Sequence, residues 1–227
     1  MPDDTYPALS NRAATGTAVE MVYVVLDDGN ARFLDAVTIN ASSGAITGGL
    51  LDGTVIDNAE YLNPANGEFS RIVRISDSNI FGAVGLDVQP VDLPTTGVTD
   101  YNEGWVGMTA VFSDNVYVLT GNAEFTVTWD GSGDIDGRFF NLSGTTSRGG
   151  TVTNEGTIIL TNGSVTDDRF AGGTVTGTGL FDRLGGTSST AGTQGVFFGR
   201  DADELGGVLL INDNAEDIQV IGAFQAD

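Results

Sequence analysis

The chain has 227 residues and a net charge of −22, from 31 acidic and nine basic residues, and it contains neither cysteine nor histidine. These absences exclude disulfide bonds, catalysis by cysteine or histidine, and the usual zinc and copper ligands. The negative charge repels nucleic acid and anionic lipid, so no nucleic-acid partner is expected. It suits either a soluble exported protein or a protein that attracts a basic partner or Ca²⁺.

Composition and periodicity favour an all-β protein. Glycine occurs 33 times, about twice its average usage, and no long segment has the apolar spacing of a helix. No stretch approaches the roughly 18 apolar residues of a membrane helix, so no membrane-spanning segment is expected. The start, Met-Pro-Asp-Asp, lacks the basic and apolar regions of a signal peptide. Export would therefore use a signal that is not visible in this chain, or another route.

The first 94 residues predict a small antiparallel sheet. Residues 1–17 are polar and are expected to form a loose lead-in. Apolar segments at 18–26 and 31–39 flank a turn signal at 27–30, which predicts a hairpin. Shorter segments bring the total to about five strands. These are residues 45–51, 54–56 and 69–75, followed by a strand or turn at 79–88.

Residues 87–99 have the composition of a linker. Pro90 and Pro94 lie within it, and proline interrupts both strands and helices. We therefore place a domain boundary near residue 95, which divides the chain into a smaller sheet at 1–94 and a second domain at 95–227.

Beyond this linker, candidate strands recur at intervals of about ten residues, as in a meander or barrel. Alternation is clearest at Phe125, Val127 and Trp129, which share one face. Eight strands suffice for a closed antiparallel β-barrel that is filled by side chains and has no exposed edge. The candidates are residues 104–112, 116–121 with 123–129, 134–142, 156–160, 170–181, 195–198, 205–211 and 218–224.

Two polar loops and two acidic turns are the candidate binding elements. The loops, 143–155 and 182–194, are rich in Gly, Ser and Thr, and are either mobile or ligand-binding. The turn at 130–137 begins with the spacing of a Ca²⁺ loop, but Ile135 stands where an EF-hand requires glycine. This turn and the one at 212–217 are therefore expected to be hairpin connections, and no metal ligand is assigned.

No arrangement of residues indicates catalysis. Carboxylates are plentiful, but nothing distinguishes one pair, and the Gly-rich segment 144–150 lacks the lysine of a phosphate-binding loop. We expect no enzyme activity, no catalytic residues and no cofactor. A haem would have only tyrosine or methionine as ligands, or no protein ligand.

Five further residues are expected to be structural. Glu204 is predicted to accept backbone N–H bonds or to pair with an arginine at the barrel rim, rather than to bind a ligand. The aromatic residues Tyr101, Trp105, Tyr117 and Trp129 are expected in the barrel core.

Residues 195–224 carry a more specific pattern. Residues 195–207 follow Gly-x-Phe-Phe-Gly-x-x-Ala-x-Glu-Leu-Gly-Gly, and Gly-Ala-Phe stands at 222–224. This pattern resembles the closing hairpins of the transferrin-binding protein B barrel, whose superfamily also includes factor H-binding protein and the haem-scavenging hemophilins. A weaker similarity extends back to about residue 97, for example at 119–125 and 170–173.

The resemblance implies an eight-stranded barrel preceded by a handle-like antiparallel sheet. It also implies an exported bacterial binding protein that captures a protein or an iron- or haem-type micronutrient, at the cell surface or after release. An outer-membrane receptor or export machinery would be a further partner. The superfamily brings no fixed ligand motif, so no cofactor-binding residue is carried over.

The alternative function is that of a structural or adhesive surface barrel with no small ligand. A pocket with apolar walls and a few convergent polar groups would favour ligand binding. A filled barrel without a cleft would favour the structural alternative.

Overall fold

The computed structural model describes the two parts of the chain to different depths. Between residues 18 and 85 it describes ten short strands, with side chains only at Ser70, Ile72, Phe81 and Ala83. From residue 93 to residue 227 it describes all but 114, 132, 185–188 and 214–215, and it omits the side chains of 189–191 and 200. The predicted lead-in at 1–17 and the linker at 87–92 lie outside the described residues.

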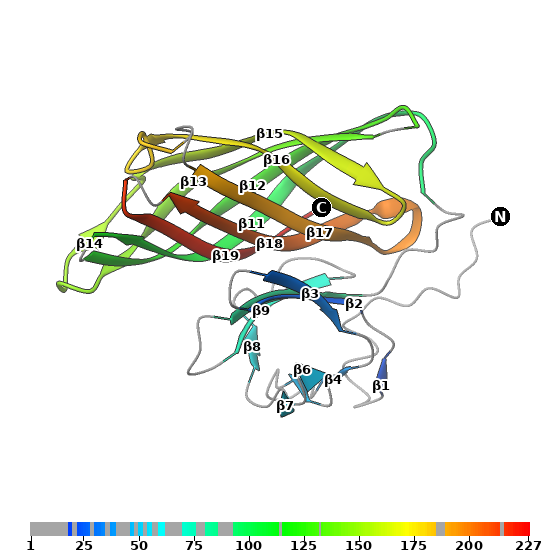
Figure 1. Ribbon diagram of the computed structural model, residues 1–227. Helices are drawn as coiled ribbons and strands as arrows, with labels where there is room; N and C mark the ends of the chain where they lie inside the picture. Colours follow the sequence, from blue (N-terminus) through cyan, green and yellow to red (C-terminus); the bar gives the residue numbers. More distant parts are fainter. Residues whose placement is uncertain are drawn as a thin grey trace.

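The C-terminal part forms a closed barrel of eight antiparallel strands (Figure 1). The strands are β11 (Gly97–Phe112), β12 (Asn115–Trp129), β13 (Asp134–Thr146), β15 (Gly156–Thr166), β16 (Arg169–Gly179), β17 (Ser189–Phe198), β18 (Glu204–Asp213) and β19 (Ile218–Ala226). Around the wall they follow the order β12-β11-β19-β18-β17-β16-β15-β13, and pairing of β13 with β12 closes the ring. The short β14 (Thr151–Val152) pairs with the end of β13.

All eight predicted barrel strands are present, but several boundaries were wrong. The candidate at 116–121 with 123–129 is one continuous strand, β12, as counted, with a register shift between Thr120 and Asn122 in its pairing with β13. Residues 97–99 of the predicted linker begin β11, and parts of both predicted loops, 143–146 and 189–194, are strand. Local polarity was misleading because every second residue of a barrel strand faces outward and can be polar.

The interior of the barrel is packed with aromatic side chains. The ring of Phe224 lies 4.9 Å from that of Phe125, 5.2 Å from that of Phe139 and 6.1 Å from that of Phe170, measured between centroids. A Cβ atom added at Gly195 would overlap the Phe170 ring, so this glycine makes room for the phenyl group. The barrel therefore encloses a solid core, as expected for eight strands.

Ten short strands precede the barrel, and five of them form a handle-like sheet in the order β3-β2-β10-β9-β8. The predicted hairpin at 18–39 is present as β2 paired with β3, but its outer ends separate from it and pair as β1 with β4. The ten strands are β1 (Ala18–Val19), β2 (Val22–Asp27), β3 (Asn30–Leu34), β4 (Val37–Ile39), β5 (Ile46–Thr47), β6 (Leu50–Leu51), β7 (Thr54–Val55), β8 (Ala59–Tyr61), β9 (Ser70–Ile75) and β10 (Ile80–Gly85). The division at 94/95 stays a prediction.

The handle-like sheet covers the outside of the barrel at β17, β18 and β19 (Figure 1). Ile72, Phe81 and Ala83 of the sheet are buried against outward-facing side chains of the barrel. The barrel side of this cluster consists of Val196, Phe198, Val208 and Ala223, with Trp105, Leu210 and Ile221 partly buried beside them. The wall is apolar on this side because the sheet excludes water from it.

A buried hydrogen bond joins the handle-like sheet to the barrel. The hydroxyl of Ser70 donates to Oε2 of Glu204 at 2.5 Å, and neither residue is more than 2% exposed. A buried carboxylate requires such donors because leaving water is costly for a charged group. The contact therefore fixes the position of the sheet on the barrel.

Gln225 on β19 is a local defect at this covered face. Gln225 is 2% exposed, and its Nε2 atom has no hydrogen-bond partner among the residues that the structure describes. An unpaired buried donor carries a desolvation cost of about 1–3 kcal/mol, which a methionine of similar shape would not carry.

We therefore expect Gln225→Met to raise the free energy of unfolding by about 1 kcal/mol. The measurement is a urea denaturation curve, with Gln219→Met as the control because Gln219 lies on the same strand but is exposed. A Gln225→Met protein no more stable than the parent would contradict this explanation.

No α-helix occurs in the described residues, where Arg200–Ala202 forms a short 3₁₀ turn. Within that part of the chain, no helix has the length and apolar character needed to cross a membrane.

Candidate functional site

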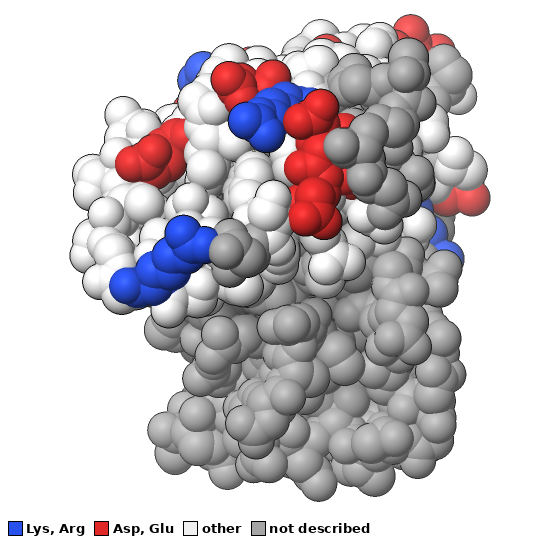
Figure 2. Space-filling view, turned by 60° about the vertical axis from the view of Figure 1, so that its left-hand side comes forward, with Lys and Arg blue, Asp and Glu red and all other residues white. Residues whose placement is uncertain are grey.

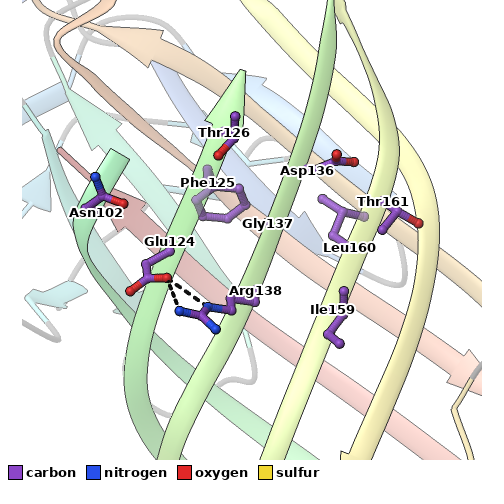
Figure 3. A pocket seen from close by; sticks show the side chains of 10 residues that line it. All are labelled: Asn102, Glu124, Phe125, Thr126, Asp136, Gly137, Arg138, Ile159, Leu160 and Thr161. Carbon is purple, nitrogen blue, oxygen red and sulfur yellow. Dashed lines mark hydrogen bonds and ion pairs between the residues drawn. The ribbon is translucent and has the colours of Figure 1, made fainter. Parts of the chain in front are cut away.

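A pocket of about 280 Å³ lies on the outer wall of the barrel, and we call it the wall pocket (Figure 3). Its residues come from β12, β13 and β15, with one from β11. In the strand order, β13 lies across the ring from β18, so the pocket faces away from the handle-like sheet. The lining residues are Asn102, Glu124, Phe125, Thr126, Asp136, Gly137, Arg138, Ile159, Leu160 and Thr161.

The floor of the wall pocket is apolar because of a glycine in β13. Gly137 pairs with Phe125 on one side and with Leu160 on the other. A Cβ atom at Gly137 would overlap the Phe125 ring, so the phenyl group occupies the space that a side chain would take. Because the wall is thin at Gly137, parts of the buried Phe125 and Leu160 line a pocket that opens outward.

One side of the wall pocket is shaped by an irregularity between β13 and β15. The register shifts between Ile135 and Gly137, and Asn162 on β15 has a positive φ of 57°. The displaced N–H group of Asn162 donates to Oδ1 of Asp136 at 2.8 Å. This bond satisfies a backbone donor that the shifted strand pairing leaves unpaired, and it fixes the Asp136 carboxylate beside the pocket.

The other side of the wall pocket is formed by an ion pair. Nε and Nη2 of Arg138 donate to Oε2 of Glu124 at 2.8 Å and 2.5 Å, as Figure 3 shows. The guanidinium also lies over the Phe140 ring, 4.7 Å from its centroid. Because the arginine side chain is 55% exposed, the pair adds little to stability. Its effect is to hold the Glu124 carboxylate in one orientation.

A second pocket of about 210 Å³ lies at the end of the barrel where the chain enters β11. Trp129 lines it, and its indole N–H donates to Oγ1 of Thr99 at 2.9 Å. Leu93, Pro94 and Val165 form apolar parts of the lining.

Tyr101, a possible haem ligand, lies in the core. The tyrosine is 1% exposed, and its hydroxyl donates to the carbonyl oxygen of Ala202 at 2.7 Å. Burial, together with the nearby negative charge of Asp203, raises the pKa of Tyr101 far above its usual value near 10. Met108 is equally buried. Neither side chain is therefore placed to meet a haem iron.

The structure separates the residues that the sequence singled out. Tyr101 and Trp129 are in the core as predicted, but Trp105 is partly buried outside the barrel beside the handle-like sheet. The prediction for Trp105 was wrong because the sequence does not show that a second sheet packs on the outer face of the barrel. An aromatic side chain on that face is partly buried without being in the barrel core. Tyr117 is partly buried against the core and contacts Phe112 edge to face. Glu204 is buried and accepts a hydrogen bond from Ser70, a partner that the sequence did not indicate, and its predicted backbone or arginine partner stays a prediction.

The two acidic segments are parts of hairpins. In the first, residues 134–137 belong to β13, and the N–H group of Gly133 donates to Oδ1 of Asp130 at 3.2 Å. In the second, residues 212–213 end β18, and the N–H group of Glu216 donates to Oδ1 of Asp213 at 3.3 Å. The described residues contain no group of three or more acidic side chains arranged to hold a metal ion.

None of the wall-pocket residues was singled out as a site from the sequence. Phe125 was noted only for its place on one face of a strand, and Asp136 only as part of the turn at 130–137. The pocket depends on the pairing of Phe125 with Gly137 and of Gly137 with Leu160, which joins three strands, and only Gly137 between polar neighbours gives a local signal.

These features define an all-β protein with a filled eight-stranded barrel, a sheet against its outside and a shallow site on the uncovered wall. The family model described as the C-lobe and N-lobe beta barrels of Tf-binding protein B matches residues 93–227. This match covers more than half of the chain, and the chain belongs to that family. A search of curated proteins finds no match.

Solved structures have the same fold at low sequence identity. Intact Ap-TbpB, with N and C lobes, is 17% identical with a TM-score of 0.59, over 92% of this chain and 46% of that one. A mutant of TbpB from Haemophilus parasuis Hp5 is 17% identical with a TM-score of 0.58, over 92% of this chain and 45% of that one. Isotype 1 TbpB from serogroup B Neisseria meningitidis is 14% identical with a TM-score of 0.51, over 92% of this chain and 43% of that one. The chain spans less than half the length of these proteins.

Proposed function

We propose that this protein is an exported bacterial binding protein without enzyme activity, which captures a protein ligand at the cell surface or after release. Membership of the family of transferrin-binding protein B barrels is the observation that carries the proposal. An outer-membrane receptor or an export system is a further partner under this proposal.

The packed interior supports a ligand that binds on the outside of the barrel. Phe125, Phe139 and Phe224 fill the space that a ligand-carrying barrel would leave open. A protein ligand needs only an outer surface, and antiparallel barrels present their loops and outward-facing side chains for that purpose. Both observations favour a protein over a micronutrient enclosed in the barrel.

The wall pocket is the observation that favours binding over the structural or adhesive alternative. A purely structural barrel has no need of an apolar depression flanked by oriented polar groups. The wall pocket has this composition, with Phe125 and Leu160 in its floor and Glu124 and Asp136 at its sides.

The proposed function predicts capture of a protein and no capture of haem. The immobilised full chain is expected to retain a protein from serum or from the native growth medium, identified by mass spectrometry, with transferrin as the first purified candidate. Titration with haem is expected to leave the Soret band unshifted, because the proposed ligand is a protein that binds on the outside of a barrel filled by aromatic side chains.

The control for retention is an unrelated immobilised protein of similar negative charge, which measures simple ion exchange. Retention of the same proteins by both columns would contradict specific capture. A saturable shift of the Soret band would contradict the proposed protein ligand and would indicate that the chain binds haem.

A further inference from the structure

We propose that the wall pocket receives the side chain of one lysine or arginine from a basic protein partner. The inference rests on the proposed function, because it assumes that the captured ligand is a protein. It adds the place on the barrel and the chemistry of the contact.

The size of the wall pocket is sufficient for a single long side chain. Its volume is about 280 Å³, just below the range of about 300–1,000 Å³ that is typical of sites for small molecules and cofactors. A haem needs a larger site, whereas one long side chain fits within this volume.

The carboxylates around the wall pocket favour a ligand that donates hydrogen bonds, and the lining also contains two side chains that can donate, Asn102 and Thr161. Oε2 of Glu124 is bonded to Arg138 and Oδ1 of Asp136 to Asn162, but the second oxygen of each carboxylate has no partner among the described residues. The hydroxyl of Thr126 donates to Asp100 at 2.8 Å, so it can offer a ligand only its lone pairs. Ammonium and guanidinium groups have donors and no acceptors, and therefore match these groups.

The floor of the wall pocket suits the aliphatic part of the same side chain. Ile159 and Leu160 line the pocket on one side of Gly137, and the Phe125 ring lies on the other side of it (Figure 3). Lysine and arginine bury their methylene groups on apolar surface while the charged end contacts polar groups. Glu124 and Asp136 stand on either side of Gly137, where they can reach the charged end (Figure 3).

The charge around the wall pocket is negative beyond the pocket itself. Strand pairing aligns Asp100 of β11, Thr126 of β12 and Asp136 of β13 in one row across the outer wall. Arg138 is already engaged by Glu124, so it does not offer a free site for an anion. On the face of the molecule that Figure 2 shows, acidic side chains and arginines lie close together on the barrel surface. This arrangement attracts a cationic partner and repels an anionic one.

The test uses n-butylammonium as a probe for the lysine side chain and propylguanidinium as a probe for arginine. Each is titrated into the ¹⁵N-labelled full chain at constant ionic strength. Saturable shifts are expected at the backbone amides of Gly137, Ile159 and Thr161 with at least one cation, and none with butyrate. Unsaturated shifts of similar size near all exposed acidic residues would overturn the proposal.

Two matched variants separate the wall pocket from general charge. Asp136→Asn retains the oxygen that accepts from Asn162, and is expected to weaken binding of the cation at least about fivefold. Asp182→Asn removes the same charge from an exposed residue in the turn after β16, and is expected to change the affinity less than about twofold. Equal effects of the two variants would overturn the proposal.

The cation titration and the protein-retention experiment can fail independently, so the wall-pocket proposal and the proposed function are tested separately. If the chain retains a protein but binds neither cation, the proposed function stands and the proposal for the wall pocket is overturned. Unchanged affinity of Asp136→Asn for the retained protein would overturn the role of the pocket in that contact. A chain that binds a cation but retains no protein would overturn the assignment of the occupant to a protein partner.

Discussion

Replacing Phe224 by alanine is expected to lower the free energy of unfolding by about 3–5 kcal/mol. Phe224 is fully buried, and its ring lies within 6.1 Å of the rings of Phe125, Phe139 and Phe170. Because these rings come from four different strands, they cannot all move into the cavity that truncation leaves. The loss is a large share of the 5–15 kcal/mol that is typical of natural proteins.

The measurement is the midpoint of urea unfolding, followed by tryptophan fluorescence. Val98→Ala is the control, because Val98 is 63% exposed and its truncation should change stability by less than about 0.5 kcal/mol. If the alanine variant fails to fold, Phe224→Leu still provides a test, with a smaller loss expected because less volume is removed. Similar midpoints for the Phe224 and Val98 variants would show that the aromatic cluster does not stabilise the barrel.

Stability is expected to fall steeply above about pH 10 because Tyr101 is held neutral in the core. Burial and the charge of Asp203 raise the pKa of Tyr101 in the folded chain, whereas unfolding returns it to about 10. The folded pKa is the higher one, so this contribution is complete below pH 10 and is lost as the pH rises towards the folded pKa. Within that window the expected loss is about 1.4 kcal/mol per pH unit.

Tyr101→Phe isolates this effect. At pH 8 the variant should be less stable than the parent by about 1–3 kcal/mol, because the Ala202 carbonyl loses its donor. Towards pH 12 the difference should shrink or reverse, because phenylalanine cannot ionise. The chain has no lysine or cysteine, so tyrosine is the side chain that changes charge in this window. Parallel stability curves for the two proteins would contradict a neutral, buried Tyr101.

The barrel could be predicted because its evidence is local. Alternation at Phe125, Val127 and Trp129 marks a strand with one buried face, and the pattern at 195–207 marks the closing hairpin. Strand ends were less accurate because a polar residue at the end of a strand has the same composition as a loop residue. For this reason residues 143–146 and 189–194 were assigned to loops although they form strands.

The contacts that define the interface and the candidate site could not be predicted in this way. Ser70 and Glu204 are 134 residues apart in the sequence, and neither residue alone indicates that a sheet covers the barrel at β18. Trp105 was misplaced for the same reason, because an outward-facing side chain becomes buried only when another sheet packs over it.

By itself, the sequence determined the all-β class, the eight barrel strands, the lack of histidine and cysteine chemistry and the strong negative charge. These properties depend on residue types and on the recurrence of apolar residues at every second position, and both are local features of the sequence. The tertiary structure alone decided which wall is covered and that Glu124, Asp136 and Leu160 surround one pocket. Those results depend on strand register and on packing between sheets, which join residues that no local pattern connects.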